Sequence, residues 1–211
     1  GSLRDGRACE PDTDEARRLL DAAGWQVGAD GIRQKNSRKL RLMLISTVKP
    51  ARQRAQELIR DAWGAVGVAV ELRSVEAPRF FGSGPDSAVR FPGDALLFAS
   101  GSDTADQTEY LCQWASERIP QPNNDWLGTN YERYRNAEYD ILCARLRVET
   151  DPAERAALTL RMNDLLVDEA VTVPLVAHRT LSARAAALRG AEPGPWDVQL
   201  WNVAAWSRQP T

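Results

Sequence analysis

The chain has 211 residues, of which 43% are apolar and 27% charged, as expected for one folded domain with a small appendage. Its 27 basic and 29 acidic residues are interleaved along the sequence, which argues against a nucleic-acid partner. The longest apolar runs are shorter than the roughly 18 residues that a membrane-spanning helix requires, so no segment of this sequence is expected to cross a bilayer.

The first predicted element is a short amphipathic helix. Asp12 and Glu15 resemble a capping box at its start, and an apolar repeat at helical spacing follows until Gly24. Residues 25–39 are rich in turn-forming residues, which favours an exposed loop or hairpin.

A strand, helix, strand unit is predicted next. Apolar residues alternate over 40–45, and Pro50 stands where a helix is expected to begin. The helical face ends near Gly67, and alternation resumes over 68–73. Residues 95–98 then form an apolar run that predicts a central buried strand.

The second half begins with a long polar stretch, residues 99–136, of the kind found at functional loops. Helices are predicted after Asn136 and after Asp151, where an N-cap, a proline and a capping acid occur together. Val171–Val176 reads as a strand in which Pro174 marks an edge or a bulge. The fold class is α/β.

The three cysteines lack a CxxC spacing, and the sequence contains one histidine, so a structural zinc site is not expected. An odd count allows at most one internal disulfide, and three buried thiols are the alternative. The cysteines are Cys9, Cys112 and Cys143.

Several segments resemble, in the same order, the extracellular solute-binding proteins of the peptide and nickel ABC importer family (family 5). Each segment combines a helix or strand boundary with a short motif typical of that family. The segments are Asp14–Trp25, Asp30–Arg33, Asn130–Tyr131, Tyr134–Asp140, Thr150–Arg155 and Asp168–Leu175.

The resemblance implies the C-terminal lobe of a two-lobe periplasmic-binding-protein-like fold, with a central mixed sheet flanked by helices. Residues 1–190 would form this ligand-binding lobe. Residues 191–211 would be a return segment that completes an N-terminal lobe outside this sequence. Trp196, Trp201 and Trp206 lie in this segment. We therefore expect Trp201 and Trp206 to be exposed, folded back onto the lobe, or buried against a neighbouring copy.

The function that the resemblance implies is that of the substrate-binding component of an ABC importer. Such a component captures a peptide or related small solute between two lobes and delivers it to the membrane permease. The resemblance also implies a periplasmic or extracellular location, a lipidated N-terminal anchor that precedes these residues, and no cofactor or enzymatic activity.

Two other function classes remain open. An interaction or sensor domain would reuse the same lobe without transport, because a fold does not fix a function. A hydrolase would need a carboxylate pair, for which Asp103 and Asp106 are the candidates. His178 stands alone, and the sequence contains no GxSxG, Walker or dinucleotide motif, so catalysis is the less favoured class.

Candidate ligand residues follow the predicted central strand, because ligands bind beyond the carboxyl ends of strands in open α/β sheets. The resemblance aligns Asp103 with an aspartate that pairs with a ligand α-amino group; a loop-capping role is the alternative. Aromatic and amide side chains further on offer stacking and polar contacts. The candidate residues are Ser100, Ser102, Asp103, Trp126, Asn130 and Tyr131. The resemblance also favours a Cys9–Cys112 disulfide, with Cys143 as a buried thiol.

Overall fold

A computed structural model of the protein describes residues 12–84, 87–101, 106–176, 183–192, 194 and 200–208. The chain forms two compact units. The first contains the residues up to Ala99 and residues 114–136, and the second contains residues 100–113 and those from Ala137 onward. Helices and strands both occur, which confirms the predicted α/β class.

A three-stranded parallel sheet lies at the centre of the first unit, in the order β5, β4, β6. The strands span Arg41–Thr47 (β4), Ala69–Val75 (β5) and Ala95–Leu97 (β6). The expectation of a central strand at 95–98 is wrong within this sheet. β4 takes the central place because it pairs on both sides, and its Ile45 is fully buried.

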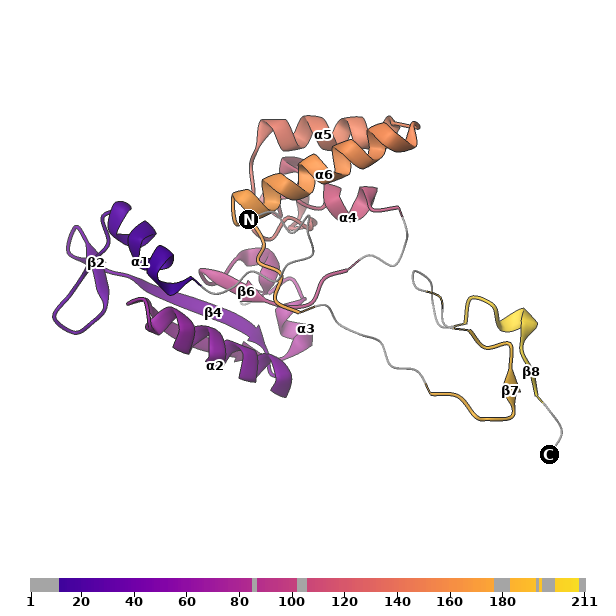
Figure 1. The fold of residues 1–211 in the computed structure, drawn as a ribbon, viewed down its shortest axis with the longest axis horizontal. Helices are drawn as coiled ribbons and strands as arrows, with labels where there is room; N and C mark the ends of the chain where they lie inside the picture. The colour runs from indigo at the N-terminus through magenta and orange to yellow at the C-terminus, as the bar shows by residue number, and fades with distance from the viewer. Residues whose placement is uncertain are drawn as a thin grey trace. The chain divides into compact units, whose positions relative to one another are not determined.

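Helix α2 (Pro50–Gly64) connects β4 to β5 and packs along both strands, which confirms the predicted strand, helix, strand unit. Figure 1 shows α2 beside β4. Pro50 starts the helix, where its missing N–H costs no hydrogen bond. Gln56 faces the sheet and is buried, and its amide nitrogen donates to the carbonyls of Leu44 (2.8 Å) and Arg73 (3.1 Å).

The N-terminal elements of the first unit also match the prediction. Asp12 caps α1 (Thr13–Ala22) by accepting from the backbone N–H of Glu15 at 2.8 Å. A small antiparallel sheet follows, consisting of β1 (Gln26–Val27), β2 (Arg33–Lys35) and β3 (Arg38–Lys39).

Arg33 joins this small sheet to the rest of the first unit. Its buried guanidinium donates to the carbonyls of Val66 (2.7 Å) and Trp25 (2.6 Å) and to the Asp21 carboxylate (2.5 Å). Gly67 passes close by with a φ of +87°, and a Cβ there would lie 2.8 Å from Arg33 Cγ. A glycine is therefore required at this position.

The remaining part of the first unit is irregular. Residues 114–136 belong to the long polar stretch for which this was expected, whereas residues 76–94 lie outside that stretch. This part contains only short helical turns among the described residues. These are α3 (Ala77–Phe80), η2 (Ala88–Arg90), η3 (Ser116–Arg118) and η4 (Pro122–Asn124).

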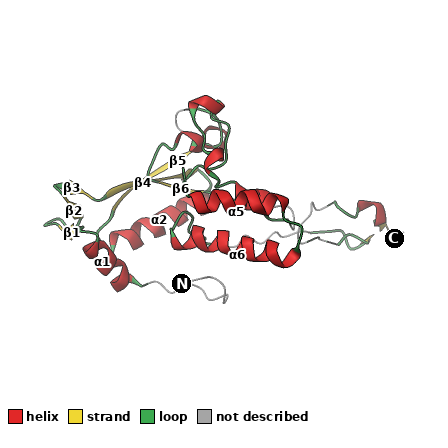
Figure 2. Ribbon diagram, turned by 90° about the horizontal axis from the view of Figure 1, so that it is seen from above, coloured by secondary structure: helices red, strands yellow, loops and turns green. Residues whose placement is uncertain are grey.

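The second unit is built around a helical hairpin, which confirms the predicted pair. α5 (Ala137–Val148) and α6 (Pro152–Asp168) lie side by side (Figure 2) and bury leucines and a methionine between them. Asp151 caps α6 by accepting from the backbone N–H groups of the two residues that follow Pro152. None of the described helices is long and apolar enough to cross a membrane.

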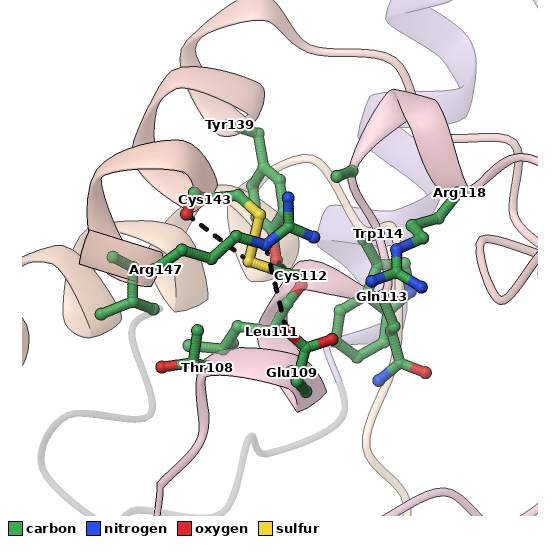
Figure 3. The surroundings of a disulfide bond; sticks show 12 residues. Thr108, Glu109, Leu111, Cys112, Gln113, Trp114, Arg118, Tyr139, Cys143 and Arg147 are labelled. Carbon is green, nitrogen blue, oxygen red and sulfur yellow. Dashed lines mark hydrogen bonds and ion pairs between the residues drawn. A yellow bond between two sulfur atoms is a disulfide. The ribbon is translucent and has the colours of Figure 1, made fainter.

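The second unit also contains α4 (Thr108–Cys112), which is tied to α5 by a disulfide between Cys112 and Cys143 (Figure 3). The expected Cys9–Cys112 pair is therefore wrong, and Cys9 lies outside the described residues. The fold brings the Cα atoms of Cys112 and Cys143 to 5.5 Å, within the range that a disulfide requires. Tyr139 strengthens the same contact because its O–H donates to the Leu111 carbonyl at 2.7 Å.

The chain after α6 differs from the prediction at one place. Val171–Val176 forms no strand: Pro174 lacks an N–H, and Val173 and Val176 are exposed. Further on, β7 (Leu188–Arg189) pairs with β8 (Ser207–Arg208), and η5 (Val203–Ala205) lies between them in sequence.

The predicted boundary at residue 190 falls between these two paired strands and stays a prediction. Trp201 is 51% exposed, which is one of the expected outcomes, and its indole N–H donates to the Glu192 carbonyl. Trp206 is half-buried and donates to Asn202 Oδ1 at 2.7 Å. Trp196 lies outside the described residues.

Candidate functional site

The register of the main sheet brings the carboxyl ends of its three strands to one edge. Thr47 pairs with Val75, and Ser46 pairs with Leu97. The residues that follow β5 and β6 therefore begin at this edge, where ligands bind in open α/β sheets.

Four aromatic rings gather beyond this edge, and we call them the aromatic cluster: Phe80, Phe81, Phe98 and Tyr131. Phe98 contacts the other three, with ring centroids 6.0 Å from Phe80, 6.2 Å from Phe81 and 5.9 Å from Tyr131. These tilted and edge-on arrangements are the favourable ones for aromatic pairs. Three separate segments of the first unit thus meet in one apolar surface.

The aromatic cluster is anchored on one side and open on the other. Phe80 is fully buried in the core with Ile45 and Val75, whereas Phe81 is 49% exposed. Phe98 and Tyr131 are half-buried. The exposed ring surface can therefore pack against an apolar or planar group of a ligand.

A cation–π pair joins two of the same segments. The guanidinium carbon of Arg90 lies 3.6 Å from the ring centroid of Trp126, and both residues are half-buried. Phe91 (φ 50°) and Trp126 (φ 62°) occupy the left-handed region, which is strained for bulky residues. Such strained residues cluster at ligand-binding sites.

Burial alters the acid–base properties beside the aromatic cluster. Desolvation raises the pKa of Glu132, and a hydrogen bond from Trp114 offsets this in part. Burial, and secondarily the Glu132 charge, raises the pKa of Tyr131, so its hydroxyl remains a hydrogen-bond donor at neutral pH.

The Asn130 side chain, predicted to contact the ligand, instead bonds to backbone groups in the interior of the first unit. Its side chain is fully buried, and its amide nitrogen donates to the carbonyls of Trp114, Ala115 and Tyr134 at 2.9–3.1 Å. Its oxygen accepts from the Tyr134 backbone N–H at 2.9 Å. Because both ends of the amide are engaged in the protein interior, the geometry does not support contact with a ligand.

Asp106 is likewise engaged within the second unit. Its Oδ1 accepts from the backbone N–H and hydroxyl of Thr108 and from Arg155 at 2.6–2.9 Å. The hydrogen bonds from Thr108 are the main reason why its pKa is lowered. A carboxyl group held in its ionised form is a poor general acid, so in the hypothetical carboxylate pair Asp106 would fit only the role of the base.

The other predicted site residues fall in different parts of the chain. Trp126 and Tyr131 lie in the first unit, in the contacts just described. Ser100 belongs to the second unit and is exposed. Ser102 and Asp103 lie outside the described residues, so their ligand role stays a prediction.

Sequence reasoning missed Phe81, Phe98 and Arg90 as site residues. Phe98 had a signal, because it is the last residue of the strand predicted at 95–98, where the chain reaches the carboxyl edge of the sheet. No signal in the sequence indicated Arg90, because Trp126, the residue it stacks on, is distant in the sequence. Among the described residues, no group of three or more His, Cys, Asp or Glu side chains is placed to hold a metal ion.

Comparisons with known proteins identify the family. The family described as "Bacterial extracellular solute-binding proteins, family 5 Middle" matches residues 3–121. An uncharacterized lipoprotein of Mycobacterium tuberculosis, Rv2585c, is 28% identical over 151 residues, which are 71% of this chain and 25% of the lipoprotein. The chain thus spans about a quarter of the length of the curated relatives it matches.

Solved structures show the same fold. An oligopeptide-binding protein from Thermus thermophilus, complexed with a pentapeptide, is 25% identical with a TM-score of 0.68, over 78% of this chain and 29% of that one. NikZ from Campylobacter jejuni, in complex with Ni(L-His), is 19% identical with a TM-score of 0.72, over 96% and 40%. The chain belongs to the bacterial extracellular solute-binding proteins of family 5.

Proposed function

We propose that this chain is the C-terminal lobe of the substrate-binding component of an ABC importer, and that the whole protein captures peptides or related small solutes between two lobes. The observation that carries the proposal is the aromatic cluster at the carboxyl edge of the parallel sheet, in a chain of the solute-binding family. Ligand would shift an open–closed equilibrium, and the closed form would deliver the solute to a membrane permease.

The proposal includes two further points. The protein binds its ligand without converting it chemically, and a lipid on its N-terminal region anchors it to the membrane outside the cytoplasm. The Thermus thermophilus protein named above is an oligopeptide-binding protein, NikZ is in complex with Ni(L-His), and the three curated relatives are called lipoproteins. Asp103 remains the proposed partner of a ligand amino group.

Calorimetry on the full-length protein tests the proposal, with a panel of di- to nonapeptides, oligosaccharides and a nickel–histidine complex. We expect micromolar or tighter binding of at least one peptide. The present chain alone should bind the same peptide very weakly, because a single lobe cannot close around it. Micromolar binding by the isolated chain would contradict the two-lobe mechanism, and mass spectrometry that finds cleaved peptide would contradict binding without turnover.

A further inference from the structure

Strand β5 leaves one edge of the main sheet open. It is the outer strand in the order β5, β4, β6, and its main packing contacts are with β4 and α2. The strand is seven residues long and contains neither proline nor glycine, so nothing in its own sequence interrupts this edge. A long open edge is a template for pairing with another strand.

The hydrogen bonds of β5 show which of its backbone groups are unused. The Ala69 N–H donates to the Leu40 carbonyl at 3.0 Å, and the Val75 carbonyl accepts from the Val48 N–H at 3.1 Å. Backbone groups point alternately to the two sides of a strand, so those of the odd-numbered residues of β5 face β4. Those of the even-numbered residues face outward, and they have no backbone partner in the described part of the chain. The outward-facing residues are Val70, Leu72 and Ser74.

The side chains of β5 are divided between the two faces of the sheet. The Ser74 hydroxyl donates to Gln56 Oε1 on α2 at 3.0 Å, so the even-numbered side chains face α2. Glu71 and Arg73 therefore lie on the opposite face, where Glu71 is exposed and Arg73 is half-buried. Among the described residues, no ion pair of Glu71 is found. One face of β5 thus carries an acid and a base, two residues apart, beside an open edge.

This strand is complementary to a second copy of itself. When two copies pair antiparallel with Leu72 opposite Leu72, Val70 lies opposite Ser74, and every outward N–H and carbonyl gains a partner. Glu71 of each copy then lies opposite Arg73 of the other, in a pair with Cα atoms about 4.5 Å apart, where opposite charges are stabilising.

The charges also select this register over its neighbours. Moving the two-fold centre by one residue would place Glu71 opposite Glu71 of the copy, or Arg73 opposite Arg73. Like charges directly opposite each other are destabilising. Charge on an edge strand usually keeps other strands away, but this pattern attracts an antiparallel copy.

We propose that β5 joins two copies of this protein in solution, antiparallel about Leu72, so that two three-stranded sheets become one sheet of six strands. The inference goes beyond the proposed transport function and does not depend on the ligand. An interface formed by one strand edge is small, which fits a weak dimer whose population depends on concentration.

Sedimentation equilibrium of the full-length protein in unlipidated form measures this association. The weight-average mass should rise from that of one copy toward that of two as the concentration increases to about 100 µM. Glu71→Arg or Arg73→Glu alone places like charges opposite each other twice, and each should weaken the dimer about tenfold or more. An equimolar mixture of these two variants should form a heterodimer, because opposite charges then meet again. The double variant should dimerise like the wild-type protein.

Two further variants serve as controls. Asp14→Arg makes an equal charge reversal at an exposed position on α1 and should leave the dimer unchanged. Leu72→Cys, in a Cys9→Ala background, should form an intermolecular disulfide, because the Cα atoms of a hydrogen-bonded antiparallel pair are about 5.5 Å apart. Val70→Cys should not, because the two copies of that residue lie four positions apart along the paired strands.

Circular dichroism checks that each variant is folded, and the two cysteine variants carry the test if a charge variant is not. A full-length protein that stays monomeric at about 100 µM would overturn the inference. Slow hydrogen exchange at the outward amides of such a monomer would show that another segment of the same chain covers the edge. A dimer that both single charge variants leave intact would also overturn the inference, because its interface would lie elsewhere.

Discussion

The Cys112–Cys143 disulfide is expected to contribute strongly to stability. The two cysteines are 31 residues apart, and closing a loop of this length in the unfolded chain corresponds to about 3.7 kcal/mol at 25 °C. Both residues are buried, so Cys112→Ala/Cys143→Ala also removes packed sulfur atoms. We therefore expect the double variant to lose about 3–5 kcal/mol of unfolding free energy.

Urea unfolding followed by circular dichroism measures this loss. Reduced wild-type protein separates the cross-link from packing, because it lacks the bond and keeps both sulfur atoms. Its m-value should rise, since the unfolded chain exposes more surface without the cross-link. Cys9→Ala is the matched control and should leave stability unchanged.

Two results would refute this reasoning. A double variant within about 1 kcal/mol of the oxidised wild-type protein would show that the bond does not restrict the unfolded chain as the loop length requires. A Cys9→Ala variant with the same loss as the double variant would show that the pairing is different. Mass spectrometry of an unreduced digest should find the peptides of Cys112 and Cys143 linked.

Three further changes are expected to have measurable effects. Gly67→Ala should lower the unfolding free energy by about 1–3 kcal/mol, since its φ of +87° and the 2.8 Å approach of Arg33 Cγ both oppose a Cβ. Asn130→Ala should cost about 2–4 kcal/mol, because it leaves buried backbone groups unpaired. Glu132 has a pKa raised by burial, so its stabilising contribution is present below the unfolded-state pKa and is lost as the pH rises through the folded-state pKa. Glu132→Gln should therefore raise the melting temperature at pH 8 and not at pH 4.

Matched controls and contrary outcomes accompany these changes. Gly64→Ala places a Cβ in open space within α2 and should not destabilise the protein, so equal losses at both glycines would contradict the role of Gly67. Asn123→Ala, at an exposed position, is the control for Asn130. Full stability of Asn130→Ala combined with lost ligand binding would restore its predicted ligand role. A Glu132→Gln effect of the same size at both pH values would contradict desolvation as its cause.

The sequence predicted those elements whose signals are local. Asp12 and Asp151 mark helix starts because an N-cap bonds to backbone groups within three residues. The strand predicted at Val171–Val176 was wrong. Alternation of apolar residues indicates a face that suits a sheet, but it does not indicate whether a partner strand is present. The predicted Cys9–Cys112 pairing was wrong because the distance between two cysteines depends on how the helices pack, which the sequence does not show.

The candidate site likewise has a part that the sequence indicated and a part that it did not. The rule for strand ends directed attention to the residues that follow Phe98, since a parallel register aligns carboxyl ends. The ligand role of Ser100, Ser102 and Asp103 stays a prediction. Trp126 and Tyr131 were chosen for their residue types, and the structure gives them aromatic and cationic neighbours. The Arg90–Trp126 pair was not predictable, because it depends on the path of an irregular loop.

The route of the chain between Cys112 and Cys143 has a consequence for proteolysis. The chain leaves the second unit after Gln113, contributes residues 114–136 to the first unit and returns at Ala137. The disulfide closes this excursion into a covalent ring. A protease that cuts once among the exposed positions of residues 122–129 would open the ring without separating the two fragments. The nicked protein would run as one band in electrophoresis without reductant and as two bands with it.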